Sequence, residues 1–166
     1  MRLRVAGILF CMCVLYNTAS AQTVQPLFFI ERTLNANIVC YDAQLNNNGL
    51  LDPEEPVSGY WLMKAEDGRR ESLTFIERTT AYGISVKPYV NPGEYLLTIV
   101  SFKDRPIRVF VNDGIVRAEM NINGGPAFLE RVFIQASGAF SRPHFIEFYG
   151  KDTRTGEERV EKVSAD

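Results

Sequence analysis

The clearest structural signal in the sequence lies in Arg105–Ile122, RPIRVFVNDGIVRAEMNI. Asp113 and Gly114 at its centre are typical of a two-residue hairpin turn, because both central positions of a type I′ turn need positive φ. Such a turn pairs residues whose numbers sum to 227, for example Val109 with Ala118. Pairs on one face are then apolar, and pairs on the other face are charged or aromatic. Turn and alternation agree on one register, which predicts a hairpin with one buried face.

Short apolar runs separated by turn residues extend this pattern along the chain, which favours further strands. The predicted strands are Leu27–Arg32, Asn37–Asp42, Gly59–Glu66, Glu94–Phe102, Phe128–Ala136, His144–Lys151 and Glu157–Val163.

The segment after the Asp67-Gly68 turn allows two interpretations. A second hairpin arm over residues 70–75 would place Leu73 opposite Leu62. Alternatively, Thr74 and Glu77 form a capping box, which favours a short helix over residues 74–82. We favour the helix. The sequence therefore predicts a mainly β domain, an antiparallel meander forming a sandwich or a partly open barrel, with one short helix near 74–82.

The first 21 residues have the features of a secretory signal peptide. Two arginines precede the apolar run Val5–Tyr16, and Ala19-Ser20-Ala21 is a typical small-residue cleavage site. The run is shorter than the roughly 20 apolar residues that a membrane-spanning helix needs. We therefore expect residues 22–166 to form a single exported domain, periplasmic or secreted, with no transmembrane segment.

Charge and cysteine content narrow the classes of partner. Without the signal peptide, the chain has 16 lysines and arginines and 20 acidic residues, so its net charge is −4. With no basic run, the chain is not expected to bind nucleic acid. Cys11 and Cys13 leave with the signal peptide, and Cys40 alone cannot form an intramolecular disulfide. We expect Cys40 to be a buried apolar residue. An intermolecular disulfide or a reactive thiol is the alternative, and a nucleophile–base pair with His144 would be one such reactive thiol.

Several stretches, taken together, resemble a known bacterial family. They are Phe29–Arg32, Asn35–Asp42, Pro56–Trp61, Ala81–Gly83 and Tyr149–Asp152 with Thr155-Gly156. As a set they are similar to the uncharacterised family named domain of unknown function 4833. The resemblance implies an exported or periplasmic β-rich domain, and it supplies no catalytic residues.

The segment Gln44–Glu55 has the spacing of a 12-residue calcium loop, with Gly49 at the sharp turn. Position one is Gln44 instead of aspartate, and strands flank the loop, so a plain asparagine-rich turn is the alternative interpretation. The candidate calcium ligands are Asn46, Asn48, Leu50 through its carbonyl, Asp52 and Glu55. No other cofactor is expected.

Two further residue sets are candidates for function. Aromatic side chains could form a platform for a ligand, with core packing as the alternative, and paired carboxylates could hydrolyse a glycosidic bond. We predict a non-enzymatic binding or interaction module of the cell envelope, with an unidentified ligand or envelope protein as partner. A carboxylate-dependent hydrolase and a calcium-stabilised interaction module are the alternatives. The aromatic residues are Tyr41, Tyr60, Trp61 and Tyr82, and the carboxylates are Glu31, Asp42, Glu77, Glu94 and Glu147.

Overall fold

The computed structural model describes residues 23–138 and 142–164, so the predicted signal peptide lies outside the described residues. Short strands separated by tight turns make up most of the chain, and two helical segments interrupt them. The strands are β1 (Thr23–Arg32), β2 (Asn35–Leu45), β3 (Val57–Leu62), β4 (Arg70–Ser72), β5 (Ile84–Pro88), β6 (Tyr95–Ile99), β7 (Ile107–Asn112), β8 (Ile115–Ile122), β9 (Gly125–Ala136), β10 (Pro143–Asp152) and β11 (Glu158–Ser164). The helical segments are α1 (Phe75–Thr80) and the 3₁₀ turn η1 (Val100–Phe102).

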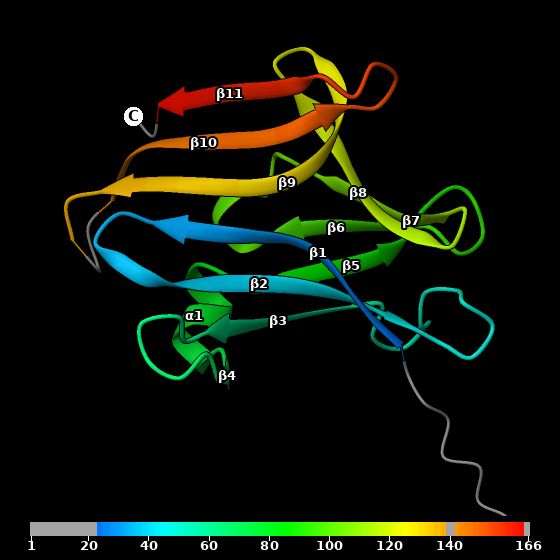
Figure 1. Cartoon of the computed structure of the whole chain (residues 1–166), viewed down its shortest axis with the longest axis horizontal. Coiled ribbons are helices and arrows are strands. Elements are labelled where there is room, and N and C mark those ends of the chain that lie inside the picture. The colour runs from blue at the N-terminus through cyan, green and yellow to red at the C-terminus, as the bar shows by residue number, and fades with distance from the viewer. Residues whose placement is uncertain (1–22, 139–141, 165–166) are drawn as a thin grey trace, which may run out of the picture.

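All eleven strands of the described residues belong to one sheet that curls into a half-barrel (Figure 1). The strand order is β4-β3-β2-β1-β9-β8-β7-β6-β5, and β10 and β11 continue from β9. β9 is the branch point. Its first residues pair with β8, its later residues pair with β1, and β10 follows it along most of its length. The result confirms the predicted mainly β fold in its partly open barrel form.

The central hairpin confirms the register predicted from the sequence. β7 and β8 pair Val109 with Ala118 and Arg108 with Glu119. Asp113 has φ 51° and Gly114 has φ 76°, as a type I′ turn requires. Val109 is fully buried, with 0% exposure, and the apolar residues that share its face are buried except Val111, which is half-buried.

Both interpretations of the segment after residue 68 are partly right. β4 is a short second arm, but it pairs Trp61 with Glu71 and Leu62 with Arg70, so Leu73 does not lie opposite Leu62. The predicted helix also forms, with the capping box, and spans Phe75–Thr80 instead of 74–82. β4 is short because the helix begins three residues after it ends.

Three further expectations about strands need correction. The predicted strand over 94–102 ends at Ile99, where η1 turns the chain, and the predicted strand over 59–66 ends at Leu62. The pairing of β1 with β9 is parallel, with Phe29 opposite Arg131, so the meander is not entirely antiparallel. Parallel neighbours need a long connection, and here most of the chain lies between the two strands.

The core lies inside the curled sheet, between the β1–β4 and β5–β8 arms. Tyr41 of β2 stacks on Phe28 of β1 with ring centroids 4.7 Å apart, and both residues are buried. On the outer face, long cationic side chains cover half-buried aromatic rings. Examples are Arg108 over Phe110 (4.3 Å) and Arg131 over Tyr149 (3.8 Å). Such contacts cover apolar surface that has no second layer above it.

Candidate functional site

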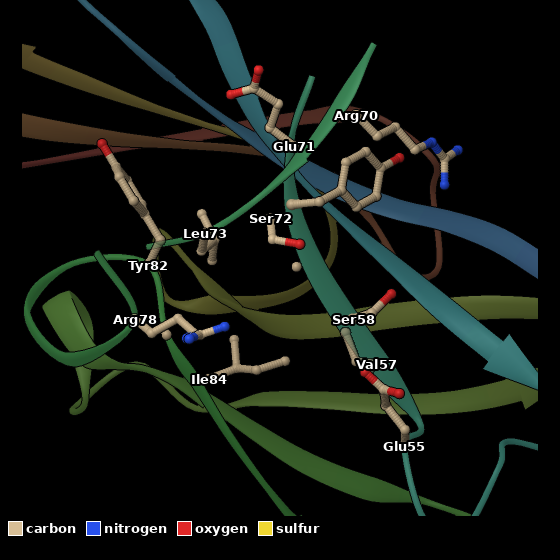
Figure 2. Close-up of a pocket in the computed structure, with 13 residues that line it drawn as sticks. Glu55, Val57, Ser58, Arg70, Glu71, Ser72, Leu73, Arg78, Tyr82 and Ile84 are labelled. Atoms are coloured by element: carbon tan, nitrogen blue, oxygen red, sulfur yellow. The ribbon is translucent and has the colours of Figure 1, made fainter. Parts of the chain in front are cut away.

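A cleft of about 550 Å³ opens between the two ends of the strand order, where a closed barrel would join (Figure 2). We call it the seam cleft. Its volume lies within the roughly 300–1,000 Å³ typical of ligand sites. Strands β3 and β4 form one wall, and the end of α1 with the start of β5 forms the other. The lining residues are Glu55, Val57, Ser58, Gly59, Tyr60, Arg70, Glu71, Ser72, Leu73, Arg78, Tyr82, Gly83 and Ile84.

The capping box holds α1 beside the cleft. Glu77 accepts a hydrogen bond from the backbone N–H of Thr74 (2.7 Å), and Thr74 Oγ1 accepts from the N–H of Glu77 (3.3 Å). The other carboxylate oxygen of Glu77 accepts from Trp61 Nε1 on β3 (3.0 Å). One carboxylate therefore both starts the helix and ties it to the sheet.

The chain leaves α1 through a close backbone approach at Gly83. A Cβ atom on Gly83 would lie 1.7 Å from the carbonyl oxygen of Arg78, so only glycine fits at this position. The Tyr41 hydroxyl donates a hydrogen bond to the carbonyl of neighbouring Tyr82 (2.8 Å) and fixes the same turn from inside the core. These contacts place Arg78 and Ile84 on the wall of the cleft.

A buried carboxylate anchors the opposite wall. Asp42 Oδ2 accepts a hydrogen bond from the Tyr60 hydroxyl (2.8 Å) and lies 3.3 Å from Arg70 Nη1. The Arg70 guanidinium also stacks on the Tyr60 ring, 4.3 Å from its centroid. Burial raises the pKa of Tyr60, and the hydrogen bond to Asp42 raises it further. Tyr60 therefore stays protonated and serves as a donor at neutral pH.

Two charged groups of the cleft have no ion-pair partner within residues 23–138 and 142–164. The guanidinium of Arg78 points into the cleft (Figure 2). Glu55 lies at the other end of the cleft from Tyr82. Both side chains are solvent-exposed, so both are accessible to a ligand.

The structure separates the four predicted aromatic ligand residues into two groups. Tyr41 is fully buried, and Trp61 packs edge to face on Tyr82 with ring centroids 5.4 Å apart. These three side chains hold α1 against the sheet. The Tyr60 side chain lies on the opposite face of β3 from Trp61. Of the four aromatic residues, Tyr60 and Tyr82 line the seam cleft.

The predicted calcium loop is closed by its own hydrogen bonds. Asn46 Oδ1 accepts from the N–H groups of Asn48 (2.9 Å) and Leu50 (3.2 Å), and the Leu50 carbonyl accepts from the Asn46 N–H (2.8 Å). Asp52 Oδ1 accepts from the N–H of Glu55 (3.1 Å). No group of three or more acidic, histidine or cysteine side chains in the described residues could hold a metal ion. Calcium binding to this loop stays a prediction.

The carboxylates considered for hydrolysis each have a separate partner. Besides Asp42 and Glu77, Glu94 binds Arg108 through two bonds (2.7 and 2.8 Å), which lowers the pKa of Glu94. Glu147 accepts from the Tyr149 hydroxyl (2.6 Å), and Glu31 lies 3.6 Å from Arg131.

Cys40 and His144 lie on strands that β1 and β9 separate. Cys40 is half-buried opposite Tyr60, whereas the His144 ring contacts the Ser137 hydroxyl. Burial raises the pKa of the Cys40 thiol, and Asp42 raises it further, which disfavours a reactive thiolate. The nucleophile–base pair that the sequence left open is not formed.

Sequence reasoning missed the charged and polar residues of the cleft, above all Arg78 and Ser72. One signal was present. Arg78 follows the capping-box glutamate directly, so it must project from the first turns of the predicted helix. What it faces depends on β3 and β5, which are distant in sequence from each other.

The fold and cleft define a β half-barrel with an open seam. The family model named domain of unknown function (DUF4833) matches residues 28–162. The chain therefore belongs to this family, as its sequence suggested. Searches of curated proteins and of solved structures found no match. In the part of the chain that the structure describes, no helix is long and apolar enough to cross a membrane.

Proposed function

We propose that the chain is an exported binding module of the cell envelope and that its ligand occupies the seam cleft. The observation that carries the proposal is the free guanidinium of Arg78, which points into a cleft of ligand size. This guanidinium is solvent-exposed and makes no ion pair within the described residues, so its charge is available to a ligand. Export is supported by the signal-like residues 1–21.

The experiment measures the melting temperature of the purified protein against a panel of short peptides and soluble oligosaccharides. A ligand that binds the native state alone raises the melting temperature. Ser72→Trp fills the cleft, because the Ser72 side chain points into it (Figure 2). Ser164→Trp is the matched control, since Ser164 is an exposed serine at the end of β11 that does not line the cleft.

At least one class of compound should stabilise the wild type and Ser164→Trp but not Ser72→Trp. The proposal fails if no compound in the panel stabilises the wild type, or if the stabilisation persists in Ser72→Trp.

A further inference from the structure

We propose that the ligand of the seam cleft is an extended peptide that adds to the free edge of β5 as a further strand and places a carboxylate against Arg78. This inference rests on the proposed function, because it names the chemical class of the ligand for the same cleft. Three features support it: the backbone groups of β5, those of the facing wall and the charge in the cleft.

The edge strand β5 borders the cleft at Ile84, and its outer edge carries unpaired backbone groups. It stands at the end of the strand order and pairs with β6 on one side. The carbonyl of Gly83 accepts a hydrogen bond from the N–H of Val100 at the start of this ladder (2.9 Å). Because every second residue of an antiparallel ladder bonds to its neighbour, Ile84 and Val86 turn their N–H and C=O groups away from β6.

The facing wall has a free backbone position as well. Pro56 accepts a hydrogen bond from Gln44 of β2 (3.0 Å), so the next residue, Val57, turns its backbone groups away from β2. β4 begins to cover this side of β3 only at Tyr60, which pairs with Ser72. The cleft thus lies between two stretches of strand edge, which are the usual template for strand addition.

The charged residues of the cleft determine which extended peptides it favours. Arg70 contacts Asp42, and Glu71 pairs with Arg69 (2.8 Å), so these charges are already compensated. The positive charge of Arg78 is not, and a carboxylate of the peptide would form a charge-assisted hydrogen bond with it. Glu55 at the other end repels a second acidic group there. The cleft therefore favours a peptide whose acidic residue lies at the Arg78 end.

The end of β5 limits the length of the added strand. Pro88 has no N–H, and Lys87 before it is exposed and charged. Both features oppose indefinite edge-to-edge association of whole sheets. A short peptide that pairs only at Ile84 and Val86 meets neither restriction.

The probes are three capped peptides of alternating threonine and valine. The first has one central glutamate, the second has lysine at that position, and the third is the glutamate peptide N-methylated at alternate residues. Binding is measured by calorimetry to the purified protein, to Arg78→Glu and to Arg154→Glu. Arg154 is an exposed arginine in the β10–β11 turn, so its reversal controls for net charge. Amide hydrogen exchange of Ile84 and Val86 is recorded with and without peptide.

The wild type and Arg154→Glu should bind the glutamate peptide about tenfold or more tightly than the lysine peptide. Arg78→Glu should reverse this preference. The N-methylated peptide should bind more weakly by a similar factor, because it lacks backbone donors. The amides of Ile84 and Val86 should exchange quickly alone and slowly in the complex.

Two results would overturn the inference and leave the proposed function intact. In the first, the glutamate peptide binds the wild type and Ser72→Trp abolishes the binding, but the amides of Ile84 and Val86 are not protected from hydrogen exchange. The second is an unchanged preference in Arg78→Glu. If Ser72→Trp binds every probe as the wild type does, the cleft is not the binding site and both proposals fail.

Discussion

Tyr41→Phe tests the contact that joins the core to the wall of the cleft. The substitution removes one hydroxyl and keeps the ring, so the stacking on Phe28 is retained. Tyr41 is fully buried, and its hydroxyl donates to the carbonyl of Tyr82 (2.8 Å). Without this donor the carbonyl loses a hydrogen bond in the interior, which costs about 1–3 kcal/mol. For a domain of this size the melting temperature should fall by roughly 3–10 °C.

The assay is urea denaturation followed by the fluorescence of Trp61, the single tryptophan of the sequence. Trp61 packs against Tyr82, so its emission reports on the docking of α1. The urea concentration at the midpoint of unfolding should fall, and the m-value should stay unchanged. Tyr89→Phe is the matched control, because Tyr89 is 41% exposed and water replaces the lost hydroxyl. Equal midpoints for the two variants would refute the argument that the Tyr41 hydroxyl stabilises the wall.

Four other expectations follow from the sequence and the structure. Val109→Asp places an unpaired carboxylate at a fully buried position and should destabilise the fold by several kcal/mol (~3 or more) in the same urea assay. Asp152 has a lowered pKa, mainly because backbone N–H groups donate to it, so its contribution is present above pH 3.8 and is lost as the pH falls below it. The stability difference between the wild type and Asp152→Asn should therefore narrow in acid unfolding curves; a constant difference would contradict this. N-terminal sequencing of the exported protein should begin at Gln22. If the loop binds calcium, about 10 mM calcium should raise the melting temperature of the wild type but not of Asp52→Asn/Glu55→Gln.

Local signals in the sequence predicted local structure well. The Asp113-Gly114 turn and the alternation around it determine the register of β7 and β8, because both act over a few residues. The capping box of Thr74 and Glu77 predicts α1 for the same reason. The parallel pairing of β1 with β9 joins segments about a hundred residues apart, and no local preference specifies it.

The aromatic set shows how a residue pattern can be interpreted too broadly. Tyr60 and Trp61 are neighbours on one strand, so their side chains must point to opposite faces. A single platform containing both could have been excluded from the sequence. The structure places Trp61 with Tyr41 and Tyr82 inside the barrel and leaves Tyr60 outside, beside Arg70.

The seam cleft itself follows from the competition between β4 and α1. An antiparallel partner of β3 would cover Val57 if β4 continued three residues past Ser72. Instead Thr74 accepts from the backbone of Glu77, and the chain turns into a helix at that point. The capping box therefore leaves part of the β3 edge open, and the tight passage at Gly83 returns the chain as the opposite wall. A strand-forming sequence in place of Thr74–Glu77 should extend β4 and close the cleft. The same four residues thus determine both the helix, which the sequence predicted, and the site, which it did not.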